Sequence, residues 1–269
     1  MILVIIVITA VCCLYVLSTI CRLGEDRIVA LYGWEYAHRG LYGNGVPENS
    51  MEAFRRARER GYGVELDVHL LADGNLAVIH DSDLKRTTEK DGRIEDLTVD
   101  QLRECFLEGT MQTIPEFGQV LRLFDGRVPL IIELKAAGKN HAELCGKVCE
   151  MLDTYSGVYC LESFDPRCIY WLKKNRPDLI RGQLAENFFK SKTSKLPWIL
   201  KFVMTFQVLN FLTRPDFVAY KFQDRKHFSN KIVDFVWKTP SVTWTLVSHE
   251  EYEVAVAEKR IPIFEGFEP

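Results

Sequence analysis

Two acidic side chains on one face of an apolar strand are the most informative pair in the sequence. Glu65 and Asp67 stand two positions apart in VELDV, and the period of two of a β-strand points both to the same side. Adjacent carboxylates repel each other, and a hard divalent cation with oxygen ligands, Ca²⁺ or Mg²⁺, relieves that repulsion. Glu133, at the end of the apolar run VPLII, is a candidate third ligand. Lys135, two residues on, shares its face and offers a compact positive charge to a phosphate oxygen.

Two histidines follow strand-like runs and form a candidate acid and base pair. Cleavage of a phosphodiester requires one group to take a proton from the attacking hydroxyl and another to protonate the departing alkoxide. The unperturbed pKa of histidine suits both tasks near neutrality, so we assign them jointly to His38 and His80. The sequence leaves open which histidine is the base. Arg39, beside His38, would neutralise charge on the non-bridging oxygens together with the cation.

The elements that must position these groups alternate between strand-length apolar runs and helical patterns. Such alternation is typical of parallel α/β architecture, and eight runs suit a closed barrel better than an open sheet. The predicted fold is therefore α/β, a TIM-type (β/α)8 barrel preceded by one N-terminal transmembrane helix. His38 and Arg39 then lie at the carboxyl end of the first strand, on the rim where barrel enzymes place their chemistry. The predicted strands are 34–37, 64–68, 128–133, 158–162, 180–183, 217–220, 241–245 and 262–264.

Two local signals refine this prediction. Asp73-Gly74 predicts a tight turn that pairs residues 70–71 with residues 76–79 in an additional hairpin. Asn49, with Glu52 three residues later, predicts a capping box at the start of the first barrel helix.

The N-terminal residues 1–20 contain no charged side chain and are long enough, as a helix, to cross a hydrocarbon core. A cleaved signal peptide is the alternative, but no basic residue precedes the run and no Ala-x-Ala-like site follows it. The expected organisation is a transmembrane anchor over 1–21, a linker over 22–33 and a barrel domain over 34–269. The protein is thus expected to be a single-pass membrane protein, and Arg22 and Arg27 slightly favour a cytoplasmic barrel.

A second apolar segment, residues 196–213, is LPWILKFVMTFQVLNFLT, in which Lys201 is the only charged residue. It could span a membrane, lie in its interface or pack over the barrel. We expect burial or interfacial contact, because a second span would separate strands that must pair. The five cysteines beyond the anchor are odd in number and contain no Cys-x-x-Cys pair, which indicates free thiols. The net charge of -3 argues against a nucleic-acid partner.

Short motifs also occur in a telling order along the chain. They are AHRG (37–40), PENS (47–50), ELDV (65–68), DG (73–74), HD (80–81), RTT (86–88), TIPEF (113–117), IELK (132–135), ESFD (162–165) and WT (244–245). This set resembles the glycerophosphodiester phosphodiesterase family over residues 34–266, and the ordered set is far more specific than any one motif. The chain departs from the family pattern at IFEGF (263–267), where many members end in an Asp-Gly-Ile-x-Thr-Asp-like segment.

The resemblance implies a role for each matched position. Two residues are implied to be catalytic, three to bind a divalent cation, two to contact phosphate and one to form a wall of the glycerol pocket. In that order they are His38 and His80; Glu65, Asp67 and Glu133; Arg39 and Lys135; and Trp244.

The implied activity is metal-dependent hydrolysis of a glycerophosphodiester, the substrate partner, to sn-glycerol 3-phosphate and an alcohol. The membrane is the other expected partner, through the N-terminal helix and residues 196–213. Two alternatives stay open. One is lysophospholipase D-like hydrolysis of lysophospholipids at the membrane, and the other is a non-catalytic phosphodiester-binding membrane protein. The second is disfavoured because no member of the catalytic set is missing.

Overall fold

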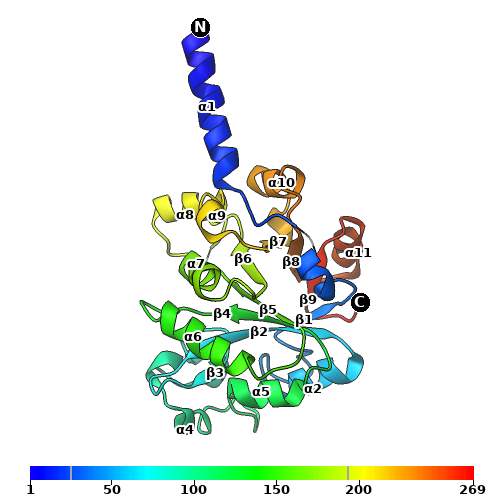
Figure 1. Ribbon diagram of the computed structural model, residues 1–269. Helices are drawn as coiled ribbons and strands as arrows, with labels where there is room; N and C mark the ends of the chain where they lie inside the picture. The colour runs from blue at the N-terminus through cyan, green and yellow to red at the C-terminus, as the bar shows by residue number, and fades with distance from the viewer. Residues whose placement is uncertain (25, 193) are drawn as a thin grey trace.

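Eight parallel strands close into a barrel in the computed structural model, which describes residues 1–24, 26–192 and 194–269 (Figure 1). The strands follow one another in the order β1-β9-β8-β7-β6-β5-β4-β2, and the pairing of β1 with β2 closes the ring. The short strand β3 pairs antiparallel with β2 outside the ring. The strands are β1 (Tyr36–His38), β2 (Gly63–Leu70), β3 (Leu76–Val78), β4 (Leu130–Leu134), β5 (Tyr159–Ser163), β6 (Arg181–Ala185), β7 (Phe217–Lys221), β8 (Ser241–Leu246) and β9 (Ile261–Phe264).

Helices connect the strands and surround the barrel (Figure 1). Three short 3₁₀ turns, η1 (Asp26–Leu31), η2 (Ile94–Asp96) and η3 (Phe222–Asp224), complete the described elements. The α-helices are α1 (Ile2–Ser18), α2 (Met51–Arg60), α3 (Lys85–Thr88), α4 (Val99–Leu102), α5 (Phe117–Phe124), α6 (His141–Leu152), α7 (Pro166–Asn175), α8 (Trp198–Thr205), α9 (Asn210–Thr213), α10 (Phe228–Phe235) and α11 (His249–Ala257).

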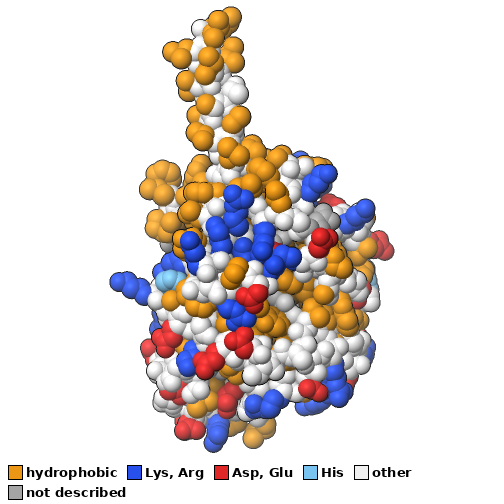
Figure 2. Space-filling view, in the orientation of Figure 1, with side chains coloured by type: hydrophobic (Ala, Val, Ile, Leu, Met, Phe, Trp, Pro, Cys, Tyr) orange, Lys and Arg blue, Asp and Glu red, His pale blue; other side chains and the backbone are white. Residues whose placement is uncertain are grey.

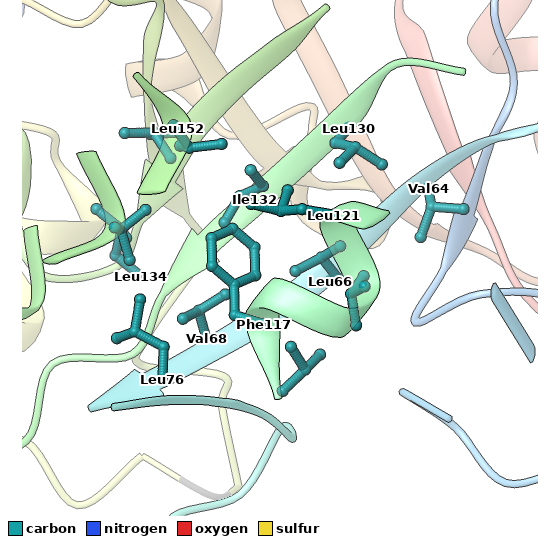
Figure 3. Packing of buried hydrophobic residues seen from close by; sticks show 14 of the residues in the cluster. Val64, Leu66, Val68, Leu76, Phe117, Leu121, Leu130, Ile132, Leu134 and Leu152 are labelled. Atoms are coloured by element: carbon teal, nitrogen blue, oxygen red, sulfur yellow. The ribbon is translucent and has the colours of Figure 1, made fainter. Parts of the chain in front are cut away.

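Strand alternation determines which side chains reach the interior of the barrel. Val64, Leu66 and Val68 of β2 belong to the apolar layer between the strands and the helices. Figure 3 shows them with Leu130, Ile132 and Leu134 of β4 around Phe117 and Leu121 of α5. Since side chains alternate along a strand, the intervening acidic residues of β2 and β4 point to the opposite face, into the barrel.

A second apolar layer fills the amino-terminal end of the barrel. Tyr36, Phe217 and Ile261, each the first residue of its strand, belong to this layer. Ile28 and Leu31 of η1 are fully buried with them, and the Tyr36 hydroxyl donates to the Leu31 carbonyl at 3.1 Å. Residues 26–31, which the sequence suggested to be a linker, therefore close this end of the barrel.

The predicted barrel is confirmed, and each of its eight predicted strands overlaps an observed one. The first strand begins at Tyr36 rather than at residue 34. The hairpin is also present, with β2 and β3 paired and the Asp73 carboxylate accepting from the Asn75 amide at 3.1 Å. All eight cysteines are free, as expected for those beyond residue 21.

The predicted capping box is wrong. The N-cap of α2 is Ser50, whose hydroxyl accepts from the Ala53 amide at 3.1 Å. Asn49 has a positive φ of 52° and its side chain donates to Asp67 instead, while Glu52 pairs with Arg55 and Arg56. Asn and Ser are both preferred at the N-cap of a helix, so the sequence alone did not distinguish Asn49 from Ser50. The predicted start of α2 was therefore one residue early.

The predicted transmembrane helix is not supported. The helix α1 has 17 residues, none of them buried, and extends away from the barrel (Figure 1). Within the described ranges, no helix is both long enough and apolar enough to traverse a bilayer. The segment 196–213, for which burial or interfacial contact was expected, forms α8 and α9 on either side of a turn in which Gln207 has a φ of 56°. It is not buried throughout, because Trp198, Ile199 and Phe202 are exposed.

One close contact in the barrel yields a stability prediction. A Cβ on Gly182 of β6 would lie 2.2 Å from the ring of Phe217, which is fully buried in β7. Gly182→Ala should therefore lower the free energy of unfolding by about 1–3 kcal/mol through overpacking. Gly146→Ala in α6 is the matched control, because its Cβ meets nothing closer than 4.0 Å and alanine favours a helix. Thermal unfolding followed by circular dichroism compares the two, and an unchanged Gly182→Ala protein would contradict this packing.

Candidate active site

Glu65, Asp67 and Glu133, the three predicted metal ligands, meet at the carboxyl end of β2 and β4. Strand register brings them together, since Asp67 pairs with Glu133 and Glu65 lies beside His38 of β1. Each of the three carboxylates offers an oxygen that lies within 4.8 Å of the other two. All three side chains are buried, as is Glu162, the neighbour of Glu133 on β5.

The electrostatics of this cluster show that its negative charge is under-compensated. Burial and the nearby charges of Asp67, Glu133 and Glu162 raise the pKa of Glu65 well above its usual value. Burial raises the pKa of Glu133 to about 7, despite the opposing effect of Lys135. The pKa of Glu162 is raised for the same reason, and one of its buried oxygens has no hydrogen-bond donor among the described residues. A cation among these oxygens would lower the cost of keeping them ionised.

Lys135 and Arg39 supply the positive charge that the cluster has. The Lys135 ammonium lies 2.9 Å from Glu133 and 3.0 Å from Asp67. The Arg39 guanidinium donates to Glu48 at 2.9 Å and lies 3.6 Å from Asp67. Although burial alone would raise the pKa of Asp67, the charges of Lys135, His80 and Arg39 hold it well below its usual range.

Each predicted catalytic histidine is held by a carboxylate through Nδ1. His38 Nδ1 lies 2.5 Å from Glu265 and its Nε2 lies 3.8 Å from Glu65. His80 Nδ1 lies 2.6 Å from Asp81. The pKa of His80 is lowered, and burial is the largest cause. In both pairs Nδ1 is engaged, which leaves Nε2 as the nitrogen available for proton transfer.

Sequence reasoning missed several residues of this network. Glu265, in the segment that departs from the family pattern, was not assigned a role. Glu48 accepts from both Arg39 and Arg86, and the Asn49 amide donates to Asp67 at 2.8 Å. Glu48 and Asn49 lie in the PENS motif and Arg86 in the RTT motif, so the motifs themselves were the available signal.

A cavity of about 590 Å³ opens over these groups, lined by both histidines, Glu65, Glu133 and Trp244. Trp244 forms part of its wall: its indole N–H donates to the Ala219 carbonyl at 3.0 Å, and its ring packs edge-on against Phe164. Lys221 lies 5.9 Å from the centre of the same ring. The cavity thus combines a charged floor with an aromatic side, a form suited to a polar headgroup on a small organic skeleton.

The donor set fits a hard divalent cation. Its candidate ligands are carboxylate oxygens, without sulfur or imidazole among them, which suits Ca²⁺ or Mg²⁺ and disfavours softer metals. The raised pKa values of Glu65 and Glu133 and the unpaired oxygen of Glu162 are the physical signs of a missing positive charge.

The cluster predicts opposite effects of one substitution on metal binding and on stability. Glu65→Gln removes one candidate ligand, so calorimetric titration with Ca²⁺ or Mg²⁺ should show at least tenfold weaker affinity. The folded-state pKa of Glu65 is raised, so its ionised form costs stability once the pH exceeds the unfolded value of about 4.3. In chelator at pH 8, Glu65→Gln should therefore unfold at a higher temperature than the unmodified protein.

The exposed Glu104→Gln serves as the matched control and should change neither quantity. Unaltered cation affinity in Glu65→Gln, or a metal-free variant less stable than its parent, would show that Glu65 has a structural role instead.

Comparison with known proteins places this site in a family. The sequence model of the glycerophosphoryl diester phosphodiesterase family matches residues 38–221. A glycerophosphodiester phosphodiesterase of Bacillus altitudinis is 41% identical over 129 residues, which cover 45% of this chain and 52% of the relative. Glycerophosphodiester phosphodiesterase 1 of Bos taurus is 44% identical over 185 residues, which cover 63% of this chain and 52% of the relative. The matches thus span about half the length of these relatives.

Solved structures agree on the fold. A phosphodiesterase of Oleispira antarctica, in complex with the product sn-glycerol-3-phosphate, superposes with a TM-score of 0.71 at 19% identity, covering 86% of this chain and 92% of the other. A glycerophosphodiester phosphodiesterase of Thermotoga maritima superposes with a TM-score of 0.64 at 26% identity. The match covers 86% of this chain and 93% of the other. Because the family model matches well over half of the residues, the chain belongs to the glycerophosphoryl diester phosphodiesterase family.

Proposed function

We propose that the protein hydrolyses glycerophosphodiesters to sn-glycerol 3-phosphate and an alcohol, assisted by Ca²⁺ or Mg²⁺. The observation that carries this proposal is the meeting of two carboxylate-held histidines with three buried carboxylates at one end of the barrel. Phosphodiester hydrolysis needs two proton-transfer groups beside a centre that neutralises phosphate charge, and this arrangement supplies both. A binding module would have no need for two histidines oriented in this way.

The two histidines exchange protons with the attacking and leaving oxygens. With Nδ1 of His38 bound to Glu265 and Nδ1 of His80 bound to Asp81, each ring presents Nε2 to the substrate. One Nε2 accepts the proton of the attacking oxygen, and the other donates a proton to the alkoxide that leaves. Direct attack by water gives sn-glycerol 3-phosphate in one step, whereas attack by the neighbouring glycerol hydroxyl gives a cyclic phosphate that a water molecule then opens. Glu265 and Asp81 hold the rings in place and stabilise their protonated forms.

Arg39 and Lys135 are proposed to bind the phosphate. Both side chains are already held by carboxylates, Arg39 by Glu48 and Lys135 by Glu133, so their positions are set before the substrate arrives. A divalent cation held by Glu65, Asp67 and Glu133 would supply Lewis-acid stabilisation of the non-bridging oxygens. Trp244 is proposed to contact the glycerol carbons.

Lysophospholipase D-like activity is the second candidate, and an aromatic cluster at the wall of the cavity favours it. Phe164 packs edge-on against Trp244 with ring centres 5.5 Å apart, and Phe188 packs against Phe164 at 6.0 Å. The Phe188 amide donates to the Thr205 hydroxyl at the end of α8, next to exposed apolar side chains. An acyl chain leaving the cavity would meet Phe164 on its wall, whereas a deacylated diester has no chain to place there.

We also propose that α1 attaches the protein to a membrane. Its residues are uncharged and mostly apolar, and none is buried, so they lie in water unless another phase covers them. Seventeen helical residues extend about 25 Å, against a hydrocarbon core of about 30 Å. Insertion of α1 would hold the enzyme at the surface where phospholipid breakdown products arise.

The proposed activity predicts metal-dependent turnover that requires His80. The full chain in detergent should release glycerol 3-phosphate from glycerophosphocholine, and chelator should abolish the reaction. His80→Ala should reduce the rate by at least 100-fold without unfolding the protein, because it removes one proton-transfer group. The exposed His249→Ala is the matched control and should be fully active.

The same assay with lysophosphatidylcholine, scored by choline release, separates the two substrate classes. A preference for the lysolipid would promote the second candidate. An active His80→Ala protein, or activity that persists in chelator, would refute the mechanism.

Glu265 is proposed as the positioning residue of His38, and its substitution separates geometry from charge. Although burial raises the pKa of Glu265, its hydrogen bond with His38 lowers that pKa to about 2, so the carboxylate is ionised at neutral pH. Glu265→Gln keeps a carbonyl acceptor for Nδ1–H but loses the charge. We expect kcat to fall about 10- to 100-fold with KM nearly unchanged, and the pH profile to shift because His38 loses its anionic partner. A change confined to KM would show that Glu265 contacts the substrate rather than the histidine.

A further inference from the structure

An exposed apolar surface surrounds the foot of α1. We call it the crown, and it consists of Trp198, Ile199 and Phe202 of α8, Phe211 of α9 and Phe228 of α10. These side chains are between 44% and 71% exposed. Figure 2 shows hydrophobic side chains continuing from α1 onto the body of the protein at this point.

Direct contacts join α1 and the residues that follow it to the elements of the crown. The Tyr15 hydroxyl donates to the Phe206 carbonyl at 3.2 Å, and the Tyr15 ring lies 5.6 Å from that of Phe228. The Trp237 indole donates to the Thr19 hydroxyl at 3.1 Å, and Cys21 is fully buried against β7 and α10. The base of α1 therefore lies against the crown.

A group of cations lies directly beneath the crown. We call it the collar, and it consists of Arg22, Arg27, Lys173, Lys174 and Arg214. The Lys173 side chain donates to the Leu212 carbonyl of α9 at 2.6 Å, which joins the collar to the crown, and the Arg214 side chain donates to the Cys21 carbonyl, just after α1, at 3.5 Å. Figure 2 shows Lys and Arg side chains gathered below the hydrophobic ones at the foot of α1.

Among the described residues, several cations of the collar gather around few carboxylates. Arg22 and Arg27 share one carboxylate, that of Asp216, at 3.7 Å and 3.1 Å. The pKa of Lys173 is lowered by burial and then by the charges of Arg214, Arg181 and Lys174, so these cations repel one another. An anionic partner would remove that repulsion.

A groove beside the collar offers room for such a partner. It lies between α7 and α9, has a volume of about 530 Å³ and is lined by Tyr170, Lys174, Leu209 and Leu212. Apolar walls with an ammonium at the edge match the boundary between a lipid headgroup and its chain.

We propose that the collar binds the anionic headgroups of a bilayer whose hydrocarbon layer receives α1 and the crown. This inference rests on the proposed membrane attachment of α1 and adds the lipid class and the residues that recognise it. The order along the α1 axis, from apolar helix to aromatic crown to cations, matches the order from hydrocarbon through interface to phosphates. A second copy of this chain would present the same positive collar and repel the first. Anionic lipids concentrate in the cytoplasmic leaflet, so the proposal places the barrel on that side.

Vesicle binding by the full chain tests this proposal. Binding to vesicles of phosphatidylcholine alone is compared with binding to vesicles that also contain phosphatidylserine, at low and high salt. The unmodified protein should prefer the anionic vesicles, and salt should weaken that preference. Lys173→Gln/Lys174→Gln should bind anionic vesicles about tenfold more weakly and bind phosphatidylcholine as before. The matched control, Lys90→Gln/Lys147→Gln, removes two exposed lysines outside the collar and should keep the preference.

The outcomes separate this inference from the proposals on which it rests. Equal binding to both lipids by the unmodified protein, or a preference that survives in Lys173→Gln/Lys174→Gln, would overturn it. Failure to bind either vesicle would refute the membrane attachment of α1 as well. Hydrolysis of glycerophosphocholine in detergent serves as the independent check, since both lysine variants should retain it and its absence would bear only on the proposed activity.

Discussion

Repulsion among buried carboxylates is the constraint on which the site depends. Glu65, Asp67, Glu133 and Glu162 come from three adjacent strands, and their register leaves them no room to move apart. The opposite faces of the same strands resist that repulsion, because their aliphatic side chains pack against α5 (Figure 3). Each fully buried side chain of this kind contributes about 1.5–3 kcal/mol. The apolar layer therefore holds in place an arrangement that is unfavourable in itself and ready for a cation.

Strain in the backbone complements this arrangement at β1. Arg39 has a φ of 57° and Asn49 a φ of 52°, a conformation that costs a residue other than glycine about 1 kcal/mol or more. Backbone hydrogen bonds join both residues to each other and to β2. The backbone N–H of Asn49 donates to the Arg39 carbonyl, and the backbone N–H of Arg39 donates to the Glu65 carbonyl. The strained turn brings the Arg39 guanidinium and the side-chain amide of Asn49 to Asp67. Positive charge and hydrogen bonds thus reach the carboxylates from the rim of the barrel.

The sequence predicted the barrel and the central residues of the site because both follow local rules. Period-two alternation identified Glu65 and Asp67, and eight apolar runs identified the strands. The partners of the histidines were harder to foresee. Glu265 reaches His38 across 227 positions of the chain through closure of β1 against β9, and no local pattern encodes such a contact. The cap at Asn49 was misassigned because tertiary contact with Asp67 outweighs its local preference. The N-terminal run was predicted from hydropathy, which says nothing of where a helix ends, and α1 stops at Ser18.

The net charge of -3 hides two very different local environments. At the barrel mouth, the carboxylates outnumber Arg39 and Lys135, so an additional cation would stabilise the cluster. At the foot of α1, Arg22 and Arg27 share the Asp216 carboxylate, and the neighbouring cations lower the pKa of Lys173 after burial does, so the proposed partner there is an anion. The net charge argues against a basic field over the whole protein, but it is a sum over all residues and so does not reveal these two local concentrations of charge. The local balance of charge, which only the fold reveals, is therefore the basis for both proposals, a cation at the barrel mouth and anionic headgroups at the foot of α1. An enzyme arranged in this way could hold a membrane with one surface while its catalytic cavity stays free for substrate.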